Sequence, residues 1–265
     1  RGVAFDLPGF GLAERPPGYD YSWTSLGRFC AAAVDELGLG RFHLVVHDIG
    51  GPVGFELATA MPVAFGTAHD ALFEFGRLQP GETALIQAGA GGVGIAAIQL
   101  ASRAGAQVLA TGSSDGKLAR LAELGLDHGI NYRTTDFAAE VRRLTGGHGT
   151  DVILDGVGGQ VLADSLRCLA YRGRCVSFGD AGRQHGTPLD ISGLRQGNQS
   201  LTGYFLGAEL IAGHRAHDMI AGLLDDVAAG QLRAVIDRTF PLAEAAAAHA
   251  YAESRQAFGR ILLKP

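Results

Sequence analysis

The chain has 265 residues, of which 47% are hydrophobic and 18% are charged, and its net charge at pH 7 is −5. This composition is typical of a folded protein with a sizeable core and excludes a disordered chain. The acidic balance and the lack of Lys/Arg runs argue against a nucleic-acid partner. No apolar run reaches the roughly 18 residues that a membrane span needs. Three cysteines, Cys30, Cys168 and Cys175, form no CxxC pair, which favours reduced, buried thiols and a cytoplasmic protein.

The first 62 residues predict a strand, a sharp turn and a helix. An apolar strand over 42–49 runs into two glycines, and the following helix ends at Met61-Pro62. This order resembles the nucleophile elbow of α/β hydrolases, in particular the haloalkane dehalogenase and epoxide hydrolase branch. The resemblance implies that Asp48 is the nucleophile, whereas the alternative is that Asp48 only caps the helix.

The hydrolase interpretation lacks its catalytic partners. Nothing after Pro62 resembles the strands that carry the general base and its orienting acid in that family. An ester formed on Asp48 would then stay unhydrolysed. We therefore expect a hydrolase-like fragment over residues 1–62, and a working hydrolase built on Asp48 stays an alternative.

A glycine-rich turn follows the next predicted strand, over 83–88. The turn Gly89-Ala90-Gly91-Gly92-Val93-Gly94 leads into an Ala-rich amphipathic helix and then into a second strand over 106–112. GxGxxG between a strand and a helix is the dinucleotide-binding pattern. Gly89 permits the tight turn, Gly91 lets the backbone approach a pyrophosphate, and Gly94 lets the helix pack close to the sheet. The helix N-terminus supplies amides for the phosphates.

The residues after the second strand favour NADP over NAD. An NAD site usually places an acidic residue at this strand end, on the ribose hydroxyls. Here the strand ends in Thr111-Gly112-Ser113-Ser114, which leaves room for a 2′-phosphate, and Lys117 could neutralise that phosphate. Asp115 favours NAD instead, because it could bind the ribose hydroxyls, but its position also suits a cap of the next helix.

Strands and helices continue to alternate along the chain. Helices are expected over 115–125, 137–147 and 160–173, and strands over 128–132, 151–155, 174–178 and 200–205. This alternation predicts an α/β fold, a doubly wound parallel Rossmann sheet with both faces covered. The ligand belongs at the C-terminal ends of the strands, where segments 89–94, 155–159 and 178–182 would meet.

Residues 63–265 resemble the zinc-free quinone oxidoreductase branch of medium-chain dehydrogenases/reductases. The resemblance rests on AFGTAHDAL, LQPGETALIQAGAGGVG, LGLDHGINY, DVILDGVGG, GRCVSFG and the terminal FGRILLKP, in which Arg260 replaces a usual Lys. It implies pyrophosphate contacts from Gly92 and Val93. It also implies a 2′-phosphate site at Ser114, Lys117 and Tyr132, and a nicotinamide site near Thr67 and Phe178.

Several of these residues have simpler interpretations. The resemblance places Phe205 either beside the cofactor or at a homodimer contact through the last strand. Phe178 and Phe205 could equally belong to the core, and Tyr132 could simply end a strand. Lys117 alone could be a solvated helix residue.

The sequence therefore predicts three parts: a hydrolase-like fragment (1–62), a Rossmann domain (63–210) and a remnant of the reductase catalytic domain (211–265). The N-terminal barrel that precedes the Rossmann domain in the family is replaced by the fragment. The implied activity is zinc-independent transfer of hydride from NADPH to a quinone or an α,β-unsaturated carbonyl. The alternative is a fusion protein that binds the nucleotide but does not turn over, because half of the substrate cleft is missing.

Overall fold

The computed structural model describes residues 62–184 and 186–264. It also describes six isolated earlier positions, which are Pro16, Pro17, Phe29, Ala32, Ala33 and Glu36. The expected hydrolase elbow and Asp48 lie outside the described residues, so the structure does not test them.

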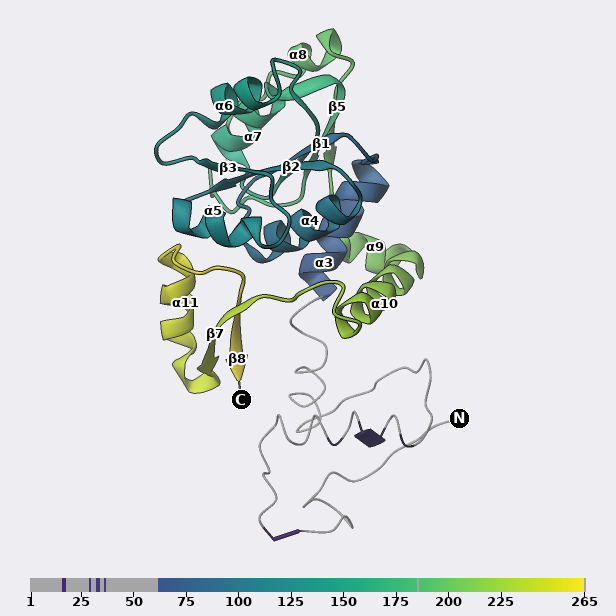
Figure 1. Cartoon of the computed structure of the whole chain (residues 1–265), viewed down its shortest axis with the longest axis vertical. Helices are drawn as coiled ribbons and strands as arrows, with labels where there is room; N and C mark the ends of the chain where they lie inside the picture. Colours follow the sequence, from purple (N-terminus) through teal and green to yellow (C-terminus); the bar gives the residue numbers. More distant parts are fainter. Residues whose placement is uncertain are drawn as a thin grey trace.

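Six parallel strands form the central sheet, in the order β3-β2-β1-β4-β5-β6 (Figure 1). The strands are β1 (Thr83–Ile86), β2 (Gln107–Gly112), β3 (His128–Asn131), β4 (Thr150–Asp155), β5 (Leu169–Ser177) and β6 (Ser200–Gly203). This is the strand order of the dinucleotide-binding Rossmann fold. The predicted α/β, doubly wound parallel sheet is therefore confirmed.

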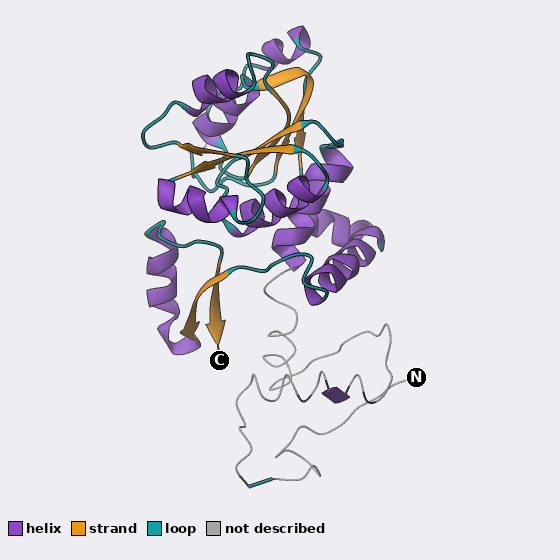
Figure 2. Ribbon diagram, viewed as in Figure 1, coloured by secondary structure: helices purple, strands orange, loops and turns teal. Residues whose placement is uncertain are grey.

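Helices cover both faces of this sheet (Figure 2). They are α3 (Pro62–His69), the π-helix η1 (Asp70–Phe75), α4 (Gly92–Arg103), α5 (Asp115–Ala122), α6 (Phe137–Leu144), α7 (Gly159–Leu166) and α8 (Ile191–Gln196). Figure 1 shows α6 and α7 on one face and α3, α4 and α5 on the other.

Alternate residues of each strand point to opposite faces and build two cores. Along β1, Ala84 and Ile86 pack with α3 and α4, whereas Leu85 packs with residues of α6 and α7. All four residues of β1 are buried. A strand that is covered on both sides has no polar face, which is why it reads as one continuous apolar run in the sequence.

The predicted helix over 160–173 is wrong beyond residue 166. Helix α7 ends at Leu166, and β5 already begins at Leu169. Leu169 pairs with Thr150, and an irregularity in the ladder precedes the next pair, Val152 with Arg174. A short apolar run has no period that separates a buried strand from a helix, so the sequence pattern did not mark this boundary. The predicted strand over 200–205 also ends early, at Gly203.

The last part of the chain leaves the central sheet. It holds α9 (Leu206–Ala212), α10 (Arg215–Ala228), β7 (Ile236–Pro241), the short 3-10 helix η2 (Leu242–Glu244), α11 (Ala245–Glu253) and β8 (Arg260–Lys264). Strands β7 and β8 pair in parallel as a separate two-stranded sheet. The predicted return strand, helix and final strand are thus β7, α11 and β8. In the described part of the chain, no helix is long and apolar enough to cross a membrane.

Candidate functional site

The glycine turn joins β1 to α4 at the C-terminal edge of the sheet. Its backbone is fixed by two bonds, from Gly89 N to Thr111 O at 2.8 Å and from Gly91 N to Ala88 O at 2.9 Å. A Cβ on Gly89 would lie 2.8 Å from the Cβ of Ala110, and one on Gly94 would lie 2.6 Å from Ala88 O. Both glycines are therefore needed for close packing between the turn, the helix and the sheet.

Helix α4 begins with backbone amides that no N-cap side chain binds. Gly91 is the N-cap residue and has no side chain to bind the first amides of the helix, those of Gly92, Val93 and Gly94. These amides and the positive end of the helix dipole form an anion site. A Cβ on Gly91 would meet little more than Ala88 O, at 3.2 Å. The turn thus has space beside Gly91, although the side chain of Arg260 lies against Gly92, and its amide donors fit the pyrophosphate of the expected dinucleotide.

The loop after β2 lies beside the glycine turn. Ser114 caps α5, and its Oγ accepts a bond from Lys117 N at 3.4 Å. Asp115 is not the cap; it lies in the first turn of α5, and its Oδ1 accepts a bond from Asn131 Nδ2 at 2.9 Å. One oxygen of the Asp115 carboxylate, the group that argued for NAD over NADP, is therefore already bonded to Asn131. Tyr132 follows β3 and is 40% exposed, with its backbone amide bound to Gly112 O.

Lys117 binds the chain's last segment rather than only solvent. Its Nζ donates to Arg255 O and to Ala257 O, both at 2.7 Å. Burial lowers the pKa of Lys117; the nearby charges of Arg133 and Arg120 lower it as well, against the charge of Asp237. An ammonium has three protons, so two carbonyls leave one for a phosphate oxygen.

Residues 255–260, here named the C-terminal clamp, also reach the glycine turn. Gly259 N donates to Ala90 O at 2.9 Å, and Gly259 forms a parallel bridge with Gly91. The side chain of Arg260 lies against Gly92, because a Cβ on that glycine would be 2.8 Å from Arg260 Cδ. The guanidinium of Arg120 stacks on the Phe258 ring, 3.7 Å from its centre.

Sequence reasoning did not foresee this clamp. It treated Arg260 only as a replacement that keeps a charge, because a contact across more than 160 residues leaves no periodic signal. The clamp adds cationic side chains to the edge of the sheet where an anionic nucleotide is expected.

The loops after β4 and β5 are joined to each other at the same edge. Phe178 N donates to Asp155 O, and Gly182 N donates to Val157 O. The Oδ1 of buried Asp155 accepts from Val157 N at 2.9 Å and from Gly158 N at 2.7 Å. Burial raises the pKa of Asp155, although these bonds oppose the shift. Two of the three segments expected at the ligand edge are thus in direct contact.

Phe178 and Phe205 lie together at a cavity of about 560 Å³. Phe178 is partly buried and packs on the core, whereas Phe205 is 72% exposed. The cavity is also lined by Phe75, Ser177, Gly179, Gly203, Tyr204, Ala208 and Glu209. Thr67 is not in this lining; it is buried in α3. The structure thus brings together the two phenylalanines but does not bring Thr67 to them.

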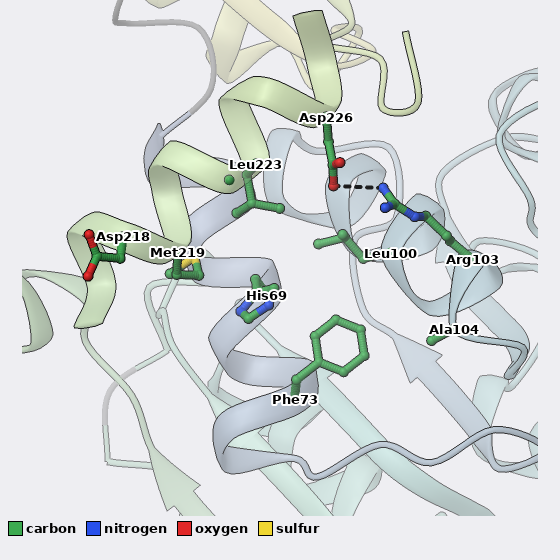
Figure 3. Close-up of a pocket in the computed structure, with 10 residues that line it drawn as sticks. His69, Phe73, Leu100, Arg103, Ala104, Asp218, Met219, Leu223 and Asp226 are labelled. Atoms are coloured by element: carbon green, nitrogen blue, oxygen red, sulfur yellow. Dashed lines mark hydrogen bonds and ion pairs between the residues drawn. The ribbon is translucent and has the colours of Figure 1, made fainter. Parts of the chain in front are cut away.

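A second cavity, of about 530 Å³, lies between α3, α4 and α10 (Figure 3). Its floor is apolar and includes Phe73, Leu100 and Leu223, and an ion pair of 2.7 Å between Arg103 and Asp226 closes one side. Its lining includes no residue of the glycine turn. This cavity is therefore separate from the edge of the sheet where the sequence predicts the nucleotide. Among the described residues, no group of three or more His, Cys, Asp and Glu side chains could hold a metal ion.

Known proteins match three quarters or more of this chain. The 2-haloacrylate reductase of Burkholderia sp is 39% identical over 202 residues, which are 75% of this chain and 60% of that protein. The structure of Escherichia coli quinone oxidoreductase complexed with NADPH matches with a TM-score of 0.73 and 31% identity, over 80% of this chain and 65% of that one. CurK enoyl reductase matches with a TM-score of 0.68 and 32% identity, over 78% and 62%.

These relatives are longer than the matched part of this chain. The chain spans about three fifths of the length of the 2-haloacrylate reductase. Its first 62 residues match a model of the alpha/beta hydrolase fold, which agrees with the resemblance seen in the sequence. The model described as zinc-binding dehydrogenase matches residues 92–225, just over half of the chain. The chain therefore belongs to the zinc-binding dehydrogenase family, the medium-chain dehydrogenases/reductases that include the quinone oxidoreductases.

Proposed function

We propose that this chain binds NADPH at the edge formed by the glycine turn and transfers hydride to an activated carbon–carbon double bond or to a quinone, without zinc. The observation that carries the proposal is the turn itself. Gly89 and Gly94 are packed where no Cβ fits, and no N-cap side chain binds the amides at the start of α4. The similar quinone oxidoreductase holds NADPH in its structure.

Different residues at the edge of the sheet bind different parts of the dinucleotide. The amides of Gly92 and Val93 bind the pyrophosphate, and Arg260 beside Gly92 adds a positive charge. Ser114 and Lys117 bind the 2′-phosphate, and Tyr132 borders it. No acidic side chain ends β2, which favours NADPH over NADH.

Bound NADPH supplies the hydride, so the protein needs no group of its own for the difficult step. The chain contributes position and a partly apolar surround. Phe178 and Phe205, at the cavity of about 560 Å³, give the place where the acceptor would sit an apolar surface. Activated alkenes fit this class of acceptor, because the names of two relatives are 2-haloacrylate reductase and enoyl reductase.

The test is to mix the full chain with NADPH and each of three acceptors, 1,4-benzoquinone, 2-cyclohexenone and 2-chloroacrylate. Loss of the nicotinamide absorbance that depends on the protein supports the proposal, and the Gly94→Ala variant serves as the matched loss of the site. No loss with any acceptor contradicts the reductase activity. Calorimetric binding of NADPH without turnover would identify the second candidate, a nucleotide-binding fusion. That candidate is favoured by the match to only 65% of the oxidoreductase.

We also propose two features outside the site, an N-terminal hydrolase-like fragment and a homodimer. Residues 1–62 are a hydrolase-like fragment, in agreement with the family model that matches them. Strand β6 lies at the edge of the sheet and leads to exposed Phe205, so a homodimer would pair two such edges. Tyr204 N donates to Ser177 O in β5, so the neighbouring amide of Gly203 faces the free edge. Sedimentation of the wild type and of Gly203→Pro, which removes that outward amide, tests the dimer. A monomeric wild type contradicts it.

A further inference from the structure

Four buried polar side chains lie beneath the glycine turn and have no part in the contacts proposed above. They are Gln87, Thr111, Asp155 and Ser165, and each is at most 4% exposed. Gln87 follows β1, Thr111 lies in β2, Asp155 ends β4, and Ser165 lies in α7. We name them the buried polar chain, because each is bonded to the next.

The hydrogen bonds of the buried polar chain all run in one donor-to-acceptor direction, from Ala88 to Asp155. Thr111 Oγ1 accepts from Ala88 N at 3.1 Å and donates to Gln87 Oε1 at 2.7 Å. Gln87 Nε2 donates to Ser165 Oγ at 2.9 Å, and Ser165 Oγ donates to Asp155 Oδ2 at 3.4 Å. An amide N–H can only donate and an ionised carboxylate can only accept, so the two ends fix the direction of every bond between them.

The buried polar chain connects two loops of the ligand edge, the glycine turn and the loop after β4. One end holds Ala88, whose φ of +54° is a strained, left-handed value for a residue with a Cβ. The same Thr111 also accepts the amide of Gly89 on its backbone carbonyl. The other end is Asp155, which binds the amides of Val157 and Gly158 in the loop after β4.

We infer that Thr111, Gln87 and Ser165 are positioning residues for the nucleotide, which they never touch. The buried polar chain holds the strained turn and the loop after β4 in one arrangement before the ligand arrives, so that no binding energy is lost in ordering them. The inference rests on the proposed function, because it assigns the ligand of the turn as NADPH.

A matched pair of variants separates positioning from ordinary stability. Thr111→Val removes the hydroxyl beneath the turn. Thr150→Val makes the same change at an equally buried threonine at the opposite end of the sheet, whose Oγ1 binds Cys168 O at 3.3 Å. Thr111→Val loses two hydrogen bonds and Thr150→Val loses one, so both should lower the midpoint of urea unfolding.

Calorimetric titration of the full chain with NADPH gives the decisive comparison. Thr111→Val should raise the dissociation constant about tenfold, whereas Thr150→Val should change it less than about twofold. Thr111→Ser, which keeps the hydroxyl, should restore binding. Equal effects of the two valine variants on the dissociation constant would overturn the inference. If Thr111→Val does not fold, Ser165→Ala removes the acceptor of Gln87, and unchanged NADPH binding by that variant overturns the inference equally.

Amide hydrogen exchange keeps this test apart from the test of the proposed function. Without any ligand, Thr111→Val should speed exchange at Ala88 and Gly89, and Thr150→Val should not. A wild type that fails to bind NADPH contradicts the proposed function, whether or not the exchange result holds. A wild type that binds, with no faster exchange in Thr111→Val, contradicts the positioning role alone.

Discussion

Replacement of Gly94 by alanine tests the packing beneath the nucleotide site most directly. The new Cβ would lie 2.6 Å from Ala88 O and 2.7 Å from both Cα and O of Gly89. All three atoms belong to the backbone, so no side chain can rotate away. To reach ordinary contact at 3.4 Å, the start of α4 must move away from the turn by about 0.8 Å (from 2.6 to 3.4 Å).

This movement has a calculable cost. Overpacking costs typically 1–3 kcal/mol, and a rigid backbone contact belongs near the upper end of that range. Alanine recovers about 1 kcal/mol over glycine inside a helix. We therefore expect Gly94→Ala to lower the free energy of unfolding by about 2 kcal/mol, measured by urea denaturation. The displaced amides should weaken NADPH binding at least tenfold, measured by calorimetry.

Two other glycines serve as controls. A Cβ on Gly116, in α5, would meet nothing within 4 Å, so Gly116→Ala should stabilise the protein by about 0.5–1 kcal/mol and leave binding unchanged. Gly91 has an ordinary φ of −79° and a single near contact at 3.2 Å. Gly91→Ala should therefore unfold nearly as the wild type does, but it should bind NADPH more weakly. A Gly94→Ala variant with wild-type stability and affinity would refute the reasoning.

Three further predictions follow from buried or clamped groups. Lys117→Met should weaken NADPH about tenfold and NADH much less, by calorimetric titration, since it removes a charged donor proposed for the 2′-phosphate; equal weakening of both would contradict that role. Burial alone would raise the pKa of the fully buried Asp70 carboxyl, but hydrogen bonds from Arg215 hold that pKa below its ordinary 3.8. The pair therefore stabilises the fold at neutral pH and loses this contribution as the pH falls below that value, so urea midpoints of wild type and Asp70→Asn should converge in acid; a constant gap would contradict this. Burial raises the pKa of Cys168 to about 12 and that of Cys175 further, so neither thiol should be alkylated at pH 8 until urea unfolds the protein, as peptide mass mapping would show; rapid labelling of the folded protein would count against it.

The sequence predicts the central sheet well because its signals are local. Each buried strand is a short apolar run, and each helix of the βαβ units follows it within a few residues, although the cap of α5 is Ser114 and not Asp115. The turn Gly89–Gly94 is recognisable for the same reason. The boundary at Leu166–Leu169 was missed, because an apolar run suits both a helix end and a buried strand.

The parts of the candidate site that the sequence did not predict depend on distant contacts. Lys117 is 138 and 140 residues away from the carbonyls that it binds. Gln87 and Ser165 are 78 residues apart in sequence and 2.9 Å apart in the buried polar chain. No spacing rule connects such residues. Only the strand order, which puts the ends of β2, β1 and β4 side by side, brings them together.

The C-terminal clamp connects the last strand of the chain to the glycine turn. Because Gly259 bonds to Ala90 and Lys117 donates to two clamp carbonyls, the segment that leads into β8 is tied to residues of the proposed coenzyme site. Coupling between two binding events is reciprocal: the factor by which the coenzyme changes the affinity of an antibody for β8 is also the factor by which that antibody changes the affinity for the coenzyme. An antibody raised against the last dozen residues would therefore change the affinity of the protein for the coenzyme.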